Sequence, residues 1–348
     1  MAAAGFSPAV ARWAGWTLDE LVRRLLERQP RAIGRAISLL ENGAGGEPGA
    51  GAGRVRAAGA RDAAGRELIG RIYGSTGRAR VVGVTGPPGA GKSTLVDRLA
   101  RRCRQRGDTV GILAVDPTSP FTGGALLGDR IRMQSLYTDP GVFIRSMATR
   151  GAMGGLARAS RDAVDVLDAA GFDWVLVETV GVGQDEVDVV RTVDSVVLVT
   201  VPGLGDDIQA IKAGILEIAD VFVINKADRE GVERTFKDLQ MMLSIGEHGV
   251  WLPPVLKAIA LRDEGLDLLL AEVERHREHL TASGELEARR RSHLKLRVET
   301  LLKERVVTAA DRVMGLDREV DRGFAAKLDP YQVADRLFAG VVDSERGP

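Results

Sequence analysis

The sequence predicts a doubly wound α/β fold, in which helices cover both faces of a mostly parallel sheet. Apolar runs recur along the chain, at residues 81–84, 110–115, 142–144, 174–177, 196–201, 221–224 and, more weakly, 255–256. Helical patterns separate most of them. The runs are continuously apolar rather than alternating, which is typical of strands buried on both faces of a parallel sheet. In such folds the site lies at the carboxyl ends of the strands, so the loops that follow them are the candidate functional segments.

Helical segments flank the α/β region on both sides. Thr17 and Glu20 form a capping box, and Pro30 opens a second helix. The Gly- and Ala-rich residues 43–59 predict a linker or exposed loop. Residues 286–310 predict a long amphipathic helix, with Leu294, Val298, Leu301 and Leu302 on one stripe. We therefore expect an N-terminal helical arm and linker (1–60), a nucleotide-binding α/β domain (61–282) and a C-terminal helical extension (283–348).

Composition narrows the class of protein. The 348 residues include 48 Lys and Arg and 48 Asp and Glu, so no net field favours nucleic acid or an acidic membrane. Cys103 is the single cysteine, which leaves no internal disulfide and fits a reducing compartment. The chain has neither a membrane-spanning apolar run nor the layout of a signal peptide. We expect a cytoplasmic protein with no nucleic-acid or membrane partner.

A phosphate-binding pattern, G-x-x-x-x-G-K-[ST], follows the first apolar run. Its residues, with the one that follows, are Gly86, Pro87, Pro88, Gly89, Ala90, Gly91, Lys92, Ser93 and Thr94. The glycines let backbone N–H groups close around phosphate oxygens, and the next helix directs its N-terminal dipole at the same anion. We expect Lys92 to reach the β- and γ-phosphates and the Ser93 hydroxyl to ligate Mg²⁺.

Two later loops carry carboxylates at the ends of predicted strands. Asp116 follows the second apolar run, and Asp129 lies in the same glycine-rich loop. Glu178 follows the fourth run, three residues before Gly181. Carboxylates beside a triphosphate repel it unless a cation lies between them, so we interpret Asp116, Asp129 and Glu178 as Mg²⁺ ligands. The alternative is that Asp116 caps a turn and Asp129 caps a helix. Gly181 can offer its N–H to the γ-phosphate and release it after hydrolysis.

The tetrapeptide Asn225-Lys226-Ala227-Asp228 follows the run at 221–224. The Asp228 carboxylate can accept hydrogen bonds from guanine N1–H and the 2-amino group, a pair of donors that adenine lacks. Lys226 can lie along the base, and Asn225 can tie this loop to the phosphate-binding loop. This pattern alone is weak, but after a strand in a chain with a phosphate-binding loop it predicts GTP rather than ATP.

These motifs together resemble a known group. Glu178-x-x-Gly181 combined with Asn225-Lys226-Ala227-Asp228 is similar to the SIMIBI-class P-loop GTPases. Three longer strings, at residues 115–124, 178–184 and 206–214, resemble the MeaB/ArgK/MMAA branch of that class. Members of this branch are GTPase chaperones of adenosylcobalamin-dependent acyl-CoA mutases, chiefly methylmalonyl-CoA mutase. The resemblance covers residues 15–340, including the helical extensions.

The resemblance implies GTP or GDP on residues 86–94, with Mg²⁺ near Ser93, Asp116, Asp129 and Glu178. It implies switches at residues 116–129 and 178–188, a segment that couples to the mutase at 203–212, and a homodimer formed through C-terminal helices. The family's base-contacting loop, usually Ser-Ala-x, aligns with Ile259, Ala260 and Leu261. The serine hydroxyl is absent here, so the implied contact is the Ala260 backbone N–H to guanine O6.

The catalytic set is therefore expected to be Lys92, Asp116, Glu178 and Gly181. Val182 follows Gly181 where Ras-like proteins have the water-orienting Gln, so hydrolysis is expected to be slow without a partner. Two other functions stay open. One is a nucleotide-dependent kinase or ATPase linked to basic amino-acid transport. The other is a nickel-insertion GTPase, although its His-rich or paired-Cys tracts are missing, and His276 and His279 are expected to be exposed on a helix.

Overall fold

The computed structural model describes residues 15–43, 52–117, 136–149, 155–179, 193–203, 219–245 and 250–346. The chain divides into two compact units, Met1–Leu286 and Glu287–Pro348. The first unit contains the sheet and the N-terminal helices, and the second is helical. Among the described helices, none combines the length and the apolar character that crossing a membrane requires.

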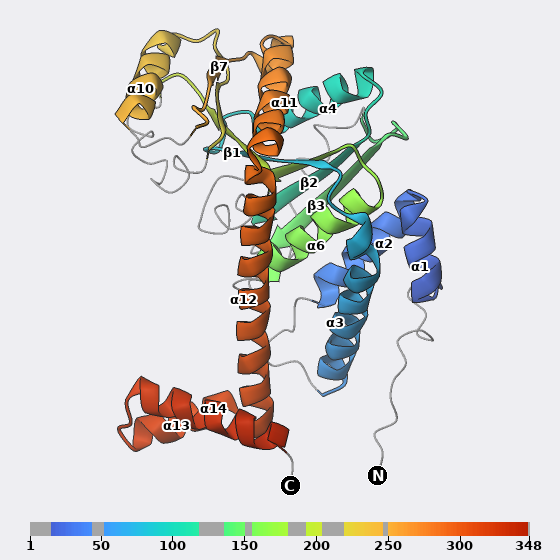
Figure 1. Ribbon diagram of the computed structural model, residues 1–348, viewed down its shortest axis with the longest axis vertical. Helices are drawn as coiled ribbons and strands as arrows, with labels where there is room; N and C mark the ends of the chain where they lie inside the picture. The colour runs from blue at the N-terminus through green and yellow to red at the C-terminus, as the bar shows by residue number, and fades with distance from the viewer. Residues whose placement is uncertain are drawn as a thin grey trace. The chain divides into compact units, whose positions relative to one another are not determined.

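Seven parallel strands form one sheet in the described part of the first unit (Figure 1). They are β1 (Arg80–Thr85), β2 (Val110–Pro117), β3 (Val142–Thr149), β4 (Trp174–Thr179), β5 (Ser195–Thr200), β6 (Val221–Ile224) and β7 (Val255–Lys257). Their spatial order is β3-β2-β4-β1-β5-β6-β7. Each strand contains or overlaps one predicted apolar run, and the predicted fold class is confirmed.

The two faces of the sheet are covered by different helices, because neighbouring residues of a strand point to opposite faces. Val81 packs into a core with the N-terminal helices α1 (Leu18–Leu26) and α2 (Pro30–Gly43) and with α6 (Gly155–Ala169). Val82 packs into a second core with α4 (Lys92–Gln105) and α11 (Leu266–Ser283). Figure 1 shows α2 and α6 on one side of the sheet and α4 and α11 on the other. A third, smaller core joins α10 (Val232–Ile245) to β5 and β6.

The N-terminal helices are part of the sheet unit. The predicted capping box is present: Thr17 N donates to Glu20 Oε2 at 2.8 Å, and Glu20 N donates to Thr17 Oγ1 at 3.2 Å. The expected linker at 43–59 is wrong in its second half, because α3 (Ala52–Ile72) already begins at Ala52. A 3-10 turn, η1 (Tyr73–Ser75), then leads into β1.

Strand β3 is longer than its apolar run, because polar side chains continue it along the edge of the sheet. Arg145 on β3 donates to Ser38 Oγ at 3.0 Å and pairs with Glu41, both on α2. Met147, two residues later, is fully buried. Helix α2 thus supplies the polar partners of Arg145, a residue that a strand prediction from apolar runs leaves out.

The second unit consists of most of α12 (Glu285–Met314) with α13 (Leu316–Ala325) and α14 (Pro330–Arg346). The predicted helix at 286–310 lies within α12. Helices α13 and α14 pack together at Gly323, where a Cβ would lie 2.4 Å from Val333. Many apolar side chains of this unit are exposed, including Leu294, Val298, Leu302, Phe324, Tyr331 and Phe338.

A buried polar cluster holds α11 against the starts of β5 and β6. His276 is fully buried and the side chain of His279 is only 20% exposed, so the expectation that both are exposed helix residues is wrong. Its Nδ1 lies 2.8 Å from Ser195 Oγ, and its Nε2 lies 3.2 Å from Asp220 Oδ1. Asp220 also accepts a hydrogen bond from Val196 N at 2.8 Å. The Trp251 ring covers the cluster, with its centroid 4.7 Å from that of His276.

Replacing His276 with Ala is expected to lower the free energy of unfolding by about 3 kcal/mol or more, because it leaves a cavity and removes a buried polar partner from Ser195 and Asp220. His279→Ala is the matched control, since His279 contacts the same Trp251 ring but its side chain is 20% exposed. Its loss is expected to cost about 1 kcal/mol or less. Urea denaturation followed by circular dichroism measures both, and equal small effects would contradict the role given to His276.

Candidate functional site

The phosphate-binding loop joins the end of β1 to the start of α4. Gly86 has φ 141°, and a Cβ there would lie 2.0 Å from the carbonyl oxygen of Val199 on β5. Gly91 has φ 89°, and a Cβ there would lie 2.5 Å from Asn225 Nδ2. The loop therefore packs closely against β5 and against the loop after β6. At Gly86 and Gly91 it has backbone conformations, with positive φ, that favour glycine.

Lys92 is the first residue of α4, and its side chain folds back over the loop that precedes it. Its Nζ donates to Gly86 O at 2.7 Å and to Pro87 O at 3.1 Å, and the residue is buried. A cation is thus held at a helix N-terminus, where the unpaired N–H groups and the dipole already favour an anion.

Ser93 and Glu178 meet beside this loop. Ser93 Oγ donates to Glu178 Oε1 at 2.5 Å, and both residues are buried. Glu178 lies at the end of β4, which pairs with β1. Next to it, Thr179 Oγ1 donates to Thr85 Oγ1 at 3.0 Å and ties the ends of the two strands together. A hydroxyl and a carboxylate oxygen this close are the hard donors that Mg²⁺ takes, so these two side chains fit the predicted metal.

Asp116 lies at the same edge of the sheet. Ala114 pairs with Glu178 in the ladder between β2 and β4, so the backbone of Asp116 follows two residues beyond this pair. The side chain of Asp116, and Asp129 and Gly181 entirely, lie outside the described residues. Within the described part of the chain, no three His, Cys, Asp or Glu side chains form a group that could hold a metal.

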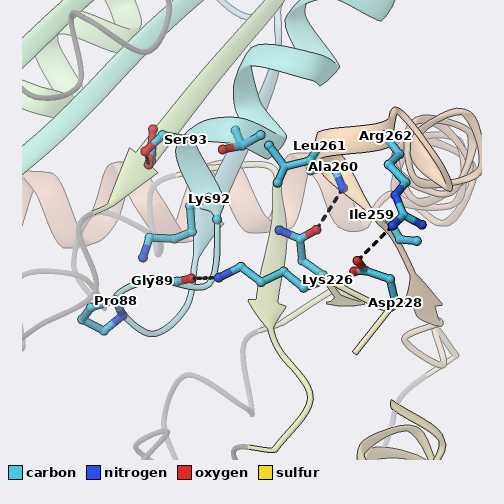
Figure 2. Close-up of a pocket in the computed structure, with 14 residues that line it drawn as sticks. Pro88, Gly89, Lys92, Ser93, Lys226, Asp228, Ile259, Ala260, Leu261 and Arg262 are labelled. Atoms are coloured by element: carbon cyan, nitrogen blue, oxygen red, sulfur yellow. Dashed lines mark hydrogen bonds and ion pairs between the residues drawn. The ribbon is translucent and has the colours of Figure 1, made fainter. Parts of the chain in front are cut away.

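Asn225, at the end of β6, joins three segments through one buried amide. Its Nδ2 donates to Ala90 O in the phosphate-binding loop at 2.8 Å, and its Oδ1 accepts from Ala260 N at 3.1 Å. Lys226 adds a parallel connection, because its Nζ donates to Gly89 O at 2.7 Å (Figure 2). These contacts agree with the expectation that Asn225 ties its loop to the phosphate-binding loop.

The loop after β7 differs from expectation in one contact. Ala260 begins the 3-10 turn η3 (Ala260–Arg262), and its N–H points at Asn225 Oδ1 rather than into the pocket. The contact from this N–H to guanine O6 that the family resemblance implied is therefore not prepared in the structure. The resemblance matched the residue but could not show that a neighbouring amide uses its only backbone donor.

A pocket of about 550 Å³ brings these segments together. Its lining residues are Pro88, Gly89, Gly91, Lys92, Ser93, Thr94, Glu178, Asn225, Lys226, Asp228, Ile259, Ala260, Leu261 and Arg262. All but the last are predicted site residues. Gly86, Pro87 and Ala90 contribute backbone carbonyls to Lys92 and Asn225 beside the pocket. The expected coupling segment after Gly203 lies outside the described residues.

Arg262 is the pocket residue that sequence reasoning missed. Its guanidinium lies 3.5 Å from Asp228 Oδ2, as Figure 2 shows. No motif marks it, and the only available signal is its position directly after the aligned residues 259–261. After the roles expected of these residues, we call the part of the pocket formed by Lys92 and the loop before it the phosphate end, and the part formed by Lys226, Asp228 and η3 the base end.

Comparison with known proteins places this geometry in a family. Residues 52–314 match the model of the family described as methylmalonyl Co-A mutase-associated GTPase MeaB. A protein of Pyrococcus abyssi that is named as a GTPase is 48% identical over 333 residues, which are 93% of this chain and 97% of that one. The Escherichia coli GTPase ArgK is 36% identical, over 78% of this chain and 79% of its own.

A solved structure of similar sequence has the same fold. A crystal structure described as LAO/AO transport system kinase superposes with a TM-score of 0.69 and 28% identity, covering 94% of this chain and 98% of that one. The family match spans most of the chain. In this chain the phosphate-binding loop, the Glu178 carboxylate and the Asn225–Asp228 loop surround one pocket. This chain therefore belongs to the MeaB family of methylmalonyl Co-A mutase-associated GTPases, and it is a GTPase.

Proposed function

We propose that this GTPase is a chaperone of an adenosylcobalamin-dependent acyl-CoA mutase, either methylmalonyl-CoA mutase or a close relative. In this role GTP hydrolysis gates cofactor loading and protects or reactivates the mutase. The observation that carries the proposal is the pocket in which Asn225 joins a phosphate-binding loop to a base-reading loop, in a chain of this family. The similarity to a mouse methylmalonic aciduria type A homolog, 35% identical over 74% of this chain and 64% of that one, adds support.

At the phosphate end, each described residue has a chemical task. Lys92 neutralises charge on the β- and γ-phosphates, and the loop N–H groups and the α4 dipole stabilise the same anion. Ser93 and Glu178 would hold Mg²⁺, together with Asp116 and Asp129 from the loop after β2. When bound, this ion neutralises the charge that develops as the phosphoryl group leaves. Gly181 would report the presence of the γ-phosphate to the loop that contains it.

At the base end, Asp228 reads guanine through N1–H and the 2-amino group, while the Lys226 stem lies along the ring. Asn225 keeps the two ends at a fixed separation, because its amide contacts both Ala90 and Ala260. A nucleotide whose phosphates fill the phosphate end therefore has its base positioned at the base end.

Val182 cannot orient a water molecule, so we propose that the mutase accelerates hydrolysis by ordering the switch loops or supplying a group. The coupling segment at 203–212 would respond to the γ-phosphate. We also propose a homodimer formed through the second unit. Exposed apolar side chains of that unit, such as Val298 on α12 with Phe324 and Phe338, form surfaces that a second copy could cover.

A kinase linked to basic amino-acid transport is the second candidate, because the structure described as LAO/AO transport system kinase shares this fold over nearly the whole chain. The two candidates differ in where the γ-phosphate goes. A chaperone GTPase releases it to water, whereas a kinase transfers it to an acceptor.

Asp228→Asn is expected to weaken GDP binding by about tenfold or more, because the amide replaces one of two acceptor oxygens with a donor. The same variant is expected to gain affinity for XDP, whose 2-oxo group suits an amide donor. Calorimetry with GDP, XDP and ADP measures the three affinities. Equal GDP and ADP affinity in the native protein would refute the assignment of Asp228.

Glu178→Gln is expected to raise the Mg²⁺ concentration for half-maximal hydrolysis by about 10- to 100-fold, because a neutral amide is a poorer ligand than a carboxylate. Glu233→Gln is the matched control, since Glu233 is exposed and pairs with Lys257 away from the pocket. Titration of GTPase activity with Mg²⁺ tests both variants. An unchanged Mg²⁺ requirement in Glu178→Gln would remove Glu178 from the metal site.

Purified protein is expected to hydrolyse GTP at a rate well below about 1 s⁻¹, and a cognate mutase is expected to raise that rate. Incubation with γ-labelled GTP, with and without the mutase, measures the rate and the fate of the label. Label found only as inorganic phosphate supports the chaperone. Label retained on a protein or amino-acid acceptor supports the kinase instead.

A further inference from the structure

We propose that Arg262 sets how strongly this GTPase discriminates guanine from related bases, by competing with the guanine 2-amino group for Asp228. The inference rests on the proposed role of Asp228 as the guanine reader. It adds a residue that no motif marks and gives it a measurable effect on base selectivity.

The backbone of Arg262 is held in place from several sides. Ile259 and Glu264 exchange backbone hydrogen bonds of 3.1 and 3.3 Å across the turn, and Arg262 N donates to Ile259 O at 2.9 Å. Arg102 on α4 contacts the following residue, with its guanidinium 3.1 Å from an Asp263 carboxylate oxygen. Because the turn is fixed to the helix that carries the phosphate-binding loop, movement at Arg262 is left to its side chain.

That side chain ends on the base-reading carboxylate. The guanidinium is 3.5 Å from Asp228 Oδ2, and both residues line the pocket (Figure 2). The Arg262 side chain is 61% exposed and that of Asp228 is 38% exposed, so the ion pair is screened and weak. It can therefore be exchanged for a ligand at small cost.

The exchange is required for guanine and not for every purine. Guanine presents two donors, N1–H and the 2-amino group, which we expect to occupy both oxygens of Asp228 and so to compete with Arg262 for Oδ2. Hypoxanthine presents only N1–H and needs one oxygen, so Arg262 can remain on Oδ2. Displacing Arg262 therefore lowers the affinity for GDP. With IDP bound, Arg262 keeps its contact with Oδ2, where the guanine 2-amino group would otherwise donate. Arg262 therefore narrows the preference for GDP over IDP.

The test is calorimetry of GDP and IDP binding to native protein and to Arg262→Ala at low and high KCl. The variant is expected to bind GDP about two- to fivefold more tightly than the native protein does, and to bind IDP with unchanged affinity. A change of this size in GDP affinity is what the loss of an exposed ion pair produces. The ratio of IDP to GDP dissociation constants therefore rises by that factor. In the native protein the ratio is expected to rise with KCl, as salt screens the ion pair, and in the variant this dependence is lost.

Arg229→Ala is the matched control, because it removes the same charge from the residue next to Asp228 and is expected to leave the ratio unchanged. An equal loss of GDP and IDP affinity in Arg262→Ala would overturn the proposal, since it would mean that the guanidinium stacks on the base. An unchanged ratio in Arg262→Ala would overturn it as well.

Asp228→Asn separates this inference from the function on which it rests. If Asp228→Asn abolishes the preference for guanine while Arg262→Ala leaves the ratio unchanged, only the role of Arg262 fails. If Asp228→Asn leaves guanine binding intact, the assignment of Asp228 itself fails. Adding Arg262→Ala to Asp228→Asn is expected to produce no further change in the ratio, because the shared carboxylate is gone.

Discussion

The amide of Asn225 is the interaction on which the geometry of the pocket depends. Its two ends are chemically different, and each meets a complementary backbone group, a carbonyl at Ala90 and an N–H at Ala260. Because the amide is buried, loss of either partner would leave a polar atom without water to replace it. This cost fixes the distance between two loops that are far apart in the sequence.

The sheet explains why those loops meet at all. The strands β1, β4 and β6 are parallel, so their carboxyl ends emerge at one edge and deliver Lys92, Glu178 and Asn225 to the same place. The N-terminal helices and α6 cover one face of this sheet, while α4 and α11 cover the other. The groups that can contact a ligand therefore lie at the carboxyl edge of the sheet, where side chains and backbone groups remain accessible.

The sequence predicted the seven strands because each contains an apolar run, and it predicted the pocket because its motifs sit at strand ends. It failed where the outcome depends on a distant partner. His276 looked like an exposed helix residue, but the fold buries it beside Ser195 and Asp220. Arg145 of β3 finds its polar partners on α2, and only the fold brings Arg262 to Asp228.

The close approach of Gly86 to β5 has a mechanical consequence. The position of a Cβ at Gly86 would fall 2.0 Å from the Val199 carbonyl oxygen, so the loop and the strand touch backbone to backbone with no compliant side chain between them. A shift of this loop would therefore press directly on the strand, because no side chain separates the two backbones. The end of β5 leads directly into Gly203 and the residues beyond it. The phosphate-binding loop therefore meets β5 at Val199, four residues before Gly203.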